Sequence, residues 1–169
     1  MTVIEGTAFA RAGLLGNPSD GYGGKVLAAA VRNFAARVRL EESRRLTFIP
    51  AAGDEESYAG IEEFVERIGL YGYYGSLRLV KAAFRAFCLY CRERGIAHHG
   101  RTFTAWAESD IPRQVGLGGS SAIVTAAMRV FMAFYEVEIP IEVQPGLVLS
   151  AERDELEINA GLQDRRAQV

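Results

Sequence analysis

Hydrophobic and polar positions alternate along the first third of the chain in the manner of half-buried strands. In residues 36–42, Val38 and Leu40 stand between charged side chains, a two-residue period that puts every second side chain on one face of a sheet. The predicted strands are 2–10, a pair at 26–33 and 36–42, and 45–50. Residues 11–25 contain Gly, Asn-Pro, Ser-Asp and Gly-Gly, and we predict turns there.

Later in the chain the apolar spacing lengthens to three and four residues, which is typical of amphipathic helices. Within 76–95, Leu77, Val80 and Phe84 follow this spacing, and basic residues before Gly95 mark the helix end. The predicted helices are 54–69, 76–95, 119–135 and 145–159, with one further strand over 101–109. We predict no regular element in residues 160–169.

Because strands come first and helices later, the order of elements predicts an α+β fold, with helices packed on one side of a mostly antiparallel sheet.

A length of 169 residues suits one domain, and 49% hydrophobic with 24% charged residues is typical of a soluble globular protein. No apolar run reaches the roughly 18 residues of a membrane span, and no signal peptide pattern is found. A net charge of −2 offers no footprint for nucleic acid. We therefore expect a cytoplasmic protein with no nucleic-acid or membrane partner.

Two cysteines, Cys88 and Cys91, form a C-x-x-C pair. A zinc site needs four ligands, and His98 and His99 could complete one on paper. Both cysteines lie in a helical pattern, however, where free Cys packs as a small hydrophobic residue. We favour a role in the core and a reducing compartment.

A glycine cluster, GLGGSS at 116–121, stands at the start of the predicted helix 119–135. Several glycines together indicate a close approach that a Cβ would block. Helix N-termini carry unpaired N–H groups and a positive partial charge, so such a loop can hold a phosphate. The spacing matches neither a Walker A loop nor a Rossmann G-x-G-x-x-G. From these residues alone, a glycine-rich turn with Ser120 or Ser121 as helix cap is an equal alternative.

Three separated segments together resemble the GHMP kinases, a family that includes galactokinase, homoserine kinase, mevalonate kinase and phosphomevalonate kinase. The segment IPRQVGLGGSSAIVTAA at 111–127 resembles their phosphate-binding motif P-x-x-x-G-L-G-S-S-A-A. ARAGLLGNPSDGYGG at 10–24 resembles their first motif, and AERDELEINAGLQDR at 151–165 the segment with an acidic metal ligand and then G-x-x-D. Within the family, GLLGNPSD, PRQVGL, GSSAIVTA and GLQDR are most similar to glucuronokinases.

The resemblance implies a fold and an activity for the chain. The fold is the GHMP N-terminal ATP-binding domain, of the ribosomal protein S5 domain 2-like class, over 1–169, with the C-terminal GHMP domain absent from this chain. The activity is that of an ATP- and Mg²⁺-dependent kinase phosphorylating D-glucuronate at its anomeric hydroxyl to glucuronate 1-phosphate. The alternatives are another GHMP-type sugar or metabolite kinase, and a catalytically silent truncated fragment that binds nucleotide. A truncated core would expose apolar surface, favouring self-association or pairing with the C-terminal half.

The resemblance also implies a set of site residues. The residues expected to wrap the ATP phosphates are Gly116, Leu117, Gly118, Gly119, Ser120 and Ser121. Ser120 and Glu152 are expected to hold Mg²⁺, while Asp164 is expected to accept the proton of the sugar hydroxyl, with Arg11 beside it. Asp20 and Asn17 are expected to bind the sugar.

Each role has a plainer alternative in the sequence itself. Glu152 adjoins other charged residues and could belong to a solvated face, Arg11 could be an ordinary exposed side chain, and Asp20 suits a turn. The chain departs from the family pattern at Gly119 and Ser121, where Ser and Ala are usual. Asn17-Pro18 replaces the Glu-His of galactokinases, which argues against galactose. A uronate carboxylate needs a cationic partner, most simply an Arg, which the sequence does not identify.

Overall fold

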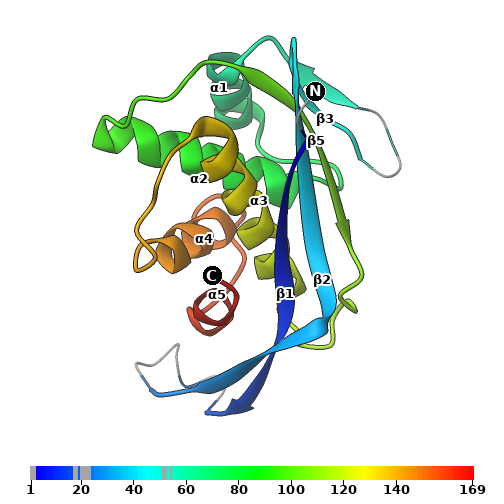
Figure 1. The fold of residues 1–169 in the computed structure, drawn as a ribbon, viewed down its shortest axis with the longest axis vertical. Coiled ribbons are helices and arrows are strands. Elements are labelled where there is room, and N and C mark those ends of the chain that lie inside the picture. The colour runs from blue at the N-terminus through cyan, green and yellow to red at the C-terminus, as the bar shows by residue number, and fades with distance from the viewer. Residues whose placement is uncertain (1–2, 17–18, 20–23, 51–52, 54) are drawn as a thin grey trace.

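The protein is described by a computed structural model over residues 3–16, 19, 24–50, 53 and 55–169. The elements in chain order are β1 (Val3–Leu15), β2 (Leu27–Ser43), β3 (Leu46–Phe48), β4 (Glu56–Tyr58), α1 (Ile61–Tyr71), α2 (Arg78–Arg94), β5 (Thr102–Ser109), α3 (Gly119–Tyr135), α4 (Gln144–Arg153) and α5 (Gln163–Gln168). The helices gather on one face of the sheet, giving two layers (Figure 1).

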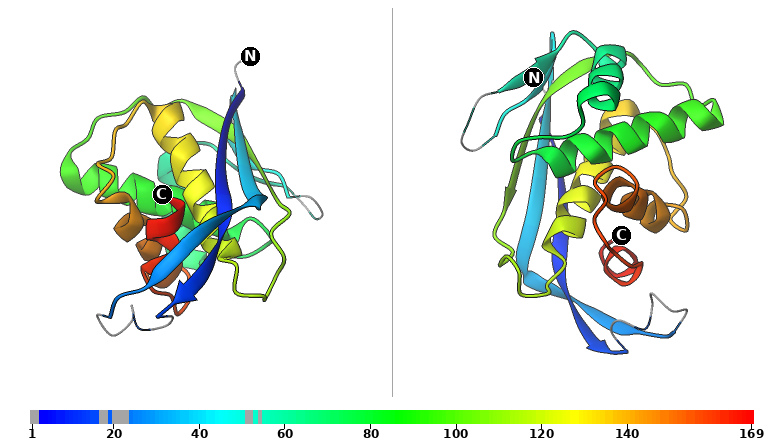
Figure 2. Two further views of the ribbon diagram at one scale, coloured as in Figure 1. Left: turned by 60° about the horizontal axis from the view of Figure 1, so that its bottom comes forward. Right: turned by 180° about the vertical axis from the view of Figure 1, so that it is seen from behind.

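The sheet has five strands in the order β1-β2-β5-β3-β4. Three of its pairings are antiparallel, and β3 runs parallel to β5. Both views in Figure 2 show the helices together on one face of the sheet. The prediction of an α+β fold with a mostly antiparallel sheet is therefore confirmed.

The first two strands are longer than predicted. β2 is one continuous strand rather than the expected pair, and residues 11–15 belong to β1 rather than to a turn. The reason lies in the register, which shifts between Phe9 and Ala10, so that the partner moves from Ala35 to Val31. Such a bulge bends a strand without ending it, and β2 bends sideways beneath α5 in Figure 1.

The helices predicted at 76–95 and 119–135 and the strand at 101–109 are confirmed within two residues as α2, α3 and β5. The helix predicted at 54–69 is wrong at its start, because Glu56–Tyr58 pairs with β3 as β4. Tyr58 then packs edge-on against Phe64, with ring centroids 5.2 Å apart. Tertiary pairing therefore outweighs the helical pattern of this segment.

The C-terminal part also differs from prediction. The helix expected over 145–159 ends at Arg153, and residues 154–156 form a turn. The turn lets Glu155 reach α2, where Arg85 Nη1 donates to it at 2.6 and 2.8 Å. Residues 160–169 were expected to be irregular, but they contain the short helix α5.

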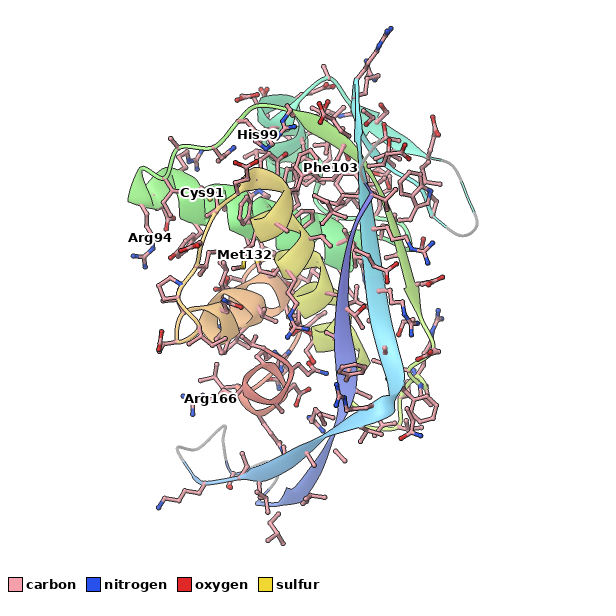
Figure 3. All side chains as sticks on the ribbon, viewed as in Figure 1. Cys91, Arg94, His99, Phe103, Met132 and Arg166 are labelled. Atoms are coloured by element: carbon pink, nitrogen blue, oxygen red, sulfur yellow. The ribbon has the colours of Figure 1, made fainter. Side chains whose placement is uncertain are left out.

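The core lies between the sheet and the helices and is rich in aromatic rings. Phe103 of β5, labelled in Figure 3, lies between the sheet and the helices. Its ring packs against those of Phe84 and Phe131 at centroid distances of 5.0 and 5.6 Å. Cys88 and Cys91 are buried and free, which confirms their role as core residues. None of the described helices is long and apolar enough to cross a membrane.

Helix α3, whose first turn carries the glycine loop, lies directly on β1. The two elements approach closely at Gly6, where an added Cβ would stand 2.5 Å from the Ala126 carbonyl oxygen and 2.7 Å from Val130 Cγ1. Only a residue without a side chain permits this distance. This packing brings the start of α3 beside Arg11, in the second half of β1.

Candidate active site

The glycine loop ends in an uncapped helix N-terminus. Gly116 and Gly118 have φ angles of 75° and 67°, in the left-handed region that glycine favours. Gly118 is the N-cap of α3, and no side chain of the described residues caps it. Ser121 Oγ instead donates to the Gly118 carbonyl at 3.0 Å. The alternative in which Ser120 or Ser121 caps the helix is therefore wrong, and the first-turn N–H groups remain available to an anion.

Arg11 of β1 joins the glycine loop to the C-terminal segment. Its Nη1 donates to the Gly116 carbonyl at 2.8 Å, and its backbone N–H donates to the Leu117 carbonyl at 3.0 Å. Its Nε donates to Asp164 Oδ1 at 2.5 Å. Arg11 is only 7% exposed, so its interpretation as an ordinary exposed side chain is wrong.

Asp164 lies in the first turn of α5, close to three donors. Besides Arg11, Ser121 Oγ stands 3.5 Å from Oδ2, and Arg165 Nη1 stands 3.7 Å from the same atom. The side chain keeps 17% of its surface exposed. The carboxylate is thus held by charge-assisted contacts and still has an open side, as a group that must meet a substrate requires.

Ser120 and Glu152, which were expected to share a metal ion, are in direct contact. Ser120 Oγ donates to Glu152 Oε1 at 2.7 Å. Glu152 is completely buried, so the alternative of a solvated face is wrong. Its other oxygen accepts a hydrogen bond from Arg165 Nη2.

Arg165 belongs to the same cluster of side chains, although the sequence did not single it out. It is 3% exposed on its side chain and bonds to Glu152 while also standing near Asp164. Its Nη1 additionally donates to the Gly161 carbonyl at 2.6 Å. The only signal in the sequence is its place next to Asp164 in QDRR, which does not distinguish it from the exposed Arg166.

The oxygen atoms of Ser120 and Glu152 fit a hard cation. Mg²⁺ prefers oxygen ligands and usually keeps waters or substrate phosphates in its shell. Across the described part of the chain, no group of three or more His, Cys, Asp or Glu could hold a metal ion. The ligands available to such an ion are the Ser120 hydroxyl and one oxygen of the Glu152 carboxylate. The other Glu152 oxygen is hydrogen-bonded to Arg165.

Comparison with known proteins assigns the chain to a family. The model of the GHMP kinases N terminal domain matches residues 78–169, which is more than half of the chain. The chain belongs to the GHMP kinase family. The match includes the glycine loop, Glu152 and Asp164, so these residues lie in the segment that defines the family domain.

Two curated relatives of this GHMP kinase chain come from Arabidopsis thaliana. The chain is 46% identical to "Probable glucuronokinase 2" over 99% of its own length and 46% of the relative. It is 45% identical to "Glucuronokinase 1" over 98% of its length and 46% of that protein. The chain thus spans about half the length of the curated relatives that it matches.

Solved structures share the GHMP kinase fold at lower identity. A D-glycero-D-manno-heptose 1-phosphate kinase from Bacteriodes thetaiotaomicron aligns with a TM-score of 0.78 at 24% identity, covering 98% of this chain and 53% of that one. The Methanococcus jannaschii mevalonate kinase aligns at 0.73 and 17%, covering 98% and 50%. The Lactococcus lactis galactokinase complexed with galactose aligns at 0.75 and 18%, covering 98% and 41%.

Of the expected site residues of this GHMP kinase chain, two fall outside the described residues. These are Asn17 and Asp20, the expected sugar ligands. The structure brings the remaining expected residues into one cluster, built from β1, the start of α3, the end of α4 and α5.

Proposed function

We propose that this chain is the ATP-binding and catalytic half of a sugar kinase that phosphorylates D-glucuronate at the anomeric hydroxyl. The observation that carries the proposal is the double contact of Arg11 with the glycine loop at Gly116 and with Asp164. A phosphate cradle and a candidate proton acceptor therefore lie in one cluster. Identities of 46% and 45% to the two glucuronokinases support glucuronate as the substrate.

Each side chain has a defined role in this proposal. The N–H groups of 116–121 bind the ATP phosphates, and Arg11 neutralises charge beside them. Asp164 orients the sugar hydroxyl and takes its proton, while the sugar oxygen bonds to the γ-phosphorus and the bond to the ADP oxygen breaks. Such transfers depend on positioning and charge neutralisation more than on covalent chemistry by the protein.

Ser120 and Glu152 are proposed to hold Mg²⁺ together with the phosphates of ATP. Bound there, the ion supplies charge neutralisation on the transferring phosphoryl group. Arg165 keeps the Glu152 carboxylate in place on its other side.

The last residues of β1 and the first residues of β2 form an exposed arm. We propose that this arm faces the remaining half of a longer kinase. Leu14, Leu15 and Leu27 are 57%, 69% and 54% exposed. Neighbouring apolar residues of this size are more often covered in a complete protein. If the arm instead joins two copies of this chain, the chain alone will elute as a dimer in gel filtration.

A second candidate function is a domain that binds nucleotide without catalysis. The observation that favours it is the length of the chain, which spans 46% of each curated relative. In this case nucleotide would bind at the glycine loop, and Asp164 would have no effect on any reaction.

The proposal is tested by measuring ADP formation from ATP in the presence of Mg²⁺. The protein is used with whatever sequence follows residue 169. The candidate substrates are D-glucuronate, D-galacturonate, galactose and mevalonate. We expect glucuronate-dependent turnover that falls about 100-fold or more in Asp164→Asn, the loss usual for a general base. Nucleotide binding, measured by calorimetry, should persist. The matched control is Asp154→Asn, which changes an exposed carboxylate paired with Arg153.

Silence across the panel with nucleotide binding intact would favour the second candidate. Silence without nucleotide binding would contradict the phosphate cradle itself. Turnover unaffected by Asp164→Asn would remove Asp164 from the catalytic role.

A further inference from the structure

A buried glutamine, Gln168, ties the glycine loop to β1. It is the last residue of α5 and is 6% exposed. Its Nε2 donates to the Gly118 carbonyl at 2.9 Å and to the Phe9 carbonyl at 3.0 Å. An amide nitrogen carries two hydrogens, so both are used on backbone groups of two different elements.

Gly118, which accepts one of these hydrogen bonds, is closely surrounded by other groups. The Gly118 carbonyl also accepts hydrogen bonds from the Ala122 N–H and from Ser121 Oγ, both at 3.0 Å. A Cβ added to Gly118 would stand 3.0 Å from Gln168 Nε2 and 3.2 Å from Arg11 Cγ. The glutamine amide therefore packs on the residue at which the glycine loop becomes α3.

The backbone of Gln168 is held as well. Its carbonyl accepts a hydrogen bond from Arg129 Nη2 at 2.7 Å. Arg129 lies on α3, and its Nη1 donates to the Thr7 carbonyl of β1. The end of α5 is consequently fixed to the same two elements that its side chain joins.

Asp164 and Gln168 are four residues apart on α5, and residues at this spacing share one face of a helix. At one end of that face, Asp164 bonds to Arg11, which bonds to Gly116. At the other end, Gln168 bonds to Gly118. The contacts form a closed ring that contains both the glycine loop and the candidate proton acceptor.

We propose that Gln168 is a positioning residue that sets the distance between a phosphate on the glycine loop and the Asp164 carboxylate. The inference rests on the proposed kinase function. Without the glutamine amide, the uncapped N-terminus of α3 and Arg11 still bind phosphate, so nucleotide affinity is kept. The alignment of the two reacting groups is lost, and misplacement of about 1 Å lowers rates by about 100-fold.

The test compares Gln168→Met with Gln144→Met in the full-length protein. Each change replaces a glutamine that donates to a backbone carbonyl; Gln144 Nε2 donates to the Ile139 carbonyl at 2.8 Å. Gln144 begins α4, at the opposite end of that helix from Glu152. The control thus loses the same kind of bond away from the glycine loop.

For Gln168→Met we expect kcat to fall at least about tenfold while the ATP dissociation constant changes less than about threefold. Gln144→Met should keep wild-type kcat, with a smaller loss of Tm because it loses one hydrogen bond rather than two. A kcat in Gln168→Met that is unchanged despite a loss of Tm would overturn the proposal, because the residue would then be merely structural.

Hydrogen exchange gives a second readout that needs no turnover. Peptides covering residues 115–122 should exchange faster in Gln168→Met than in wild type or Gln144→Met. If the wild type phosphorylates no sugar, the proposed function fails, and exchange still decides whether Gln168 fixes the loop. Unchanged exchange in Gln168→Met would overturn the inference in either case.

Discussion

At the scale of single residues, the site depends on glycines whose backbone conformation disfavours any side chain. Gly116 and Gly118 both have positive φ angles, but their surroundings differ. A Cβ on Gly116 would meet nothing within 4 Å among the described atoms, whereas one on Gly118 would meet Gln168, Arg11 and Ser121 at 3.0 to 3.3 Å. The first glycine is required for conformation alone and the second for conformation and space.

This difference predicts unequal losses for Gly116→Ala and Gly118→Ala. Each substitution should lower the free energy of unfolding by about 1 kcal/mol, because a left-handed conformation is strained for alanine. Gly118→Ala should lose at least about 1 kcal/mol more, since tightly packed neighbours must move. Urea unfolding of the two variants measures the difference, and equal losses would show that the neighbours shift freely.

At the scale of elements, α5 is a short helix held by buried charged groups rather than by an apolar face. Glu152 of α4 is completely buried, and Arg165 of α5 is 3% exposed. The ion pair between them joins the two helices. A sequence pattern cannot show such a helix, because its six residues contain no apolar repeat and its stability comes from partners on other elements.

The buried ion pair predicts that Arg165→Met is strongly destabilising. Removing one partner leaves an uncompensated buried carboxylate, which costs about 3 to 5 kcal/mol. Adding Glu152→Gln should recover part of the loss, because the buried charge is then gone. The matched control is Arg166→Met, an exposed neighbour on the same helix (Figure 3), expected within about 0.5 kcal/mol of wild type. Chemical denaturation measures all three, and a neutral Arg165→Met would show that water reaches Glu152.

At the scale of the whole molecule, the two layers enclose a core that contains several ionisable groups. Burial raises the pKa of the Cys91 thiol from 9.0 to about 11 and raises that of Cys88 further. Burial also raises the pKa values of Tyr73 and Tyr135 above their ordinary range. In the unfolded chain these groups lose their protons at lower pH than in the folded protein.

Alkaline pH should therefore destabilise the fold. Above pH 9.0, the ordinary value for Cys, the unfolded state binds fewer protons than the native state, so stability falls as pH rises through about 11. Thermal unfolding between pH 8 and 11 measures the effect. Cys88→Ala combined with Cys91→Ala should reduce the slope over this range, and an unchanged slope would assign it to the tyrosines.

The sequence by itself determined the fold class and most elements. The three/four spacing of α2 and α3 and the alternation of β2 and β5 are local patterns, set by one buried face each. The motifs around Arg11, around Gly118 and from Glu152 to Asp164 also determined the family, because these three segments agreed in order and spacing.

Only the tertiary structure decided how these segments meet. β4 forms because it pairs with the preceding strand β3, and α5 forms because its polar side chains meet partners on other elements. β2 continues because a bulge in its pairing with β1 bends it. Arg165 and Gln168 became visible as site residues only once Glu152 and Gly118 stood beside them. Local periodicity reports which face of an element is buried, but the partner of a buried polar group lies elsewhere in the chain, and only folding brings the two together.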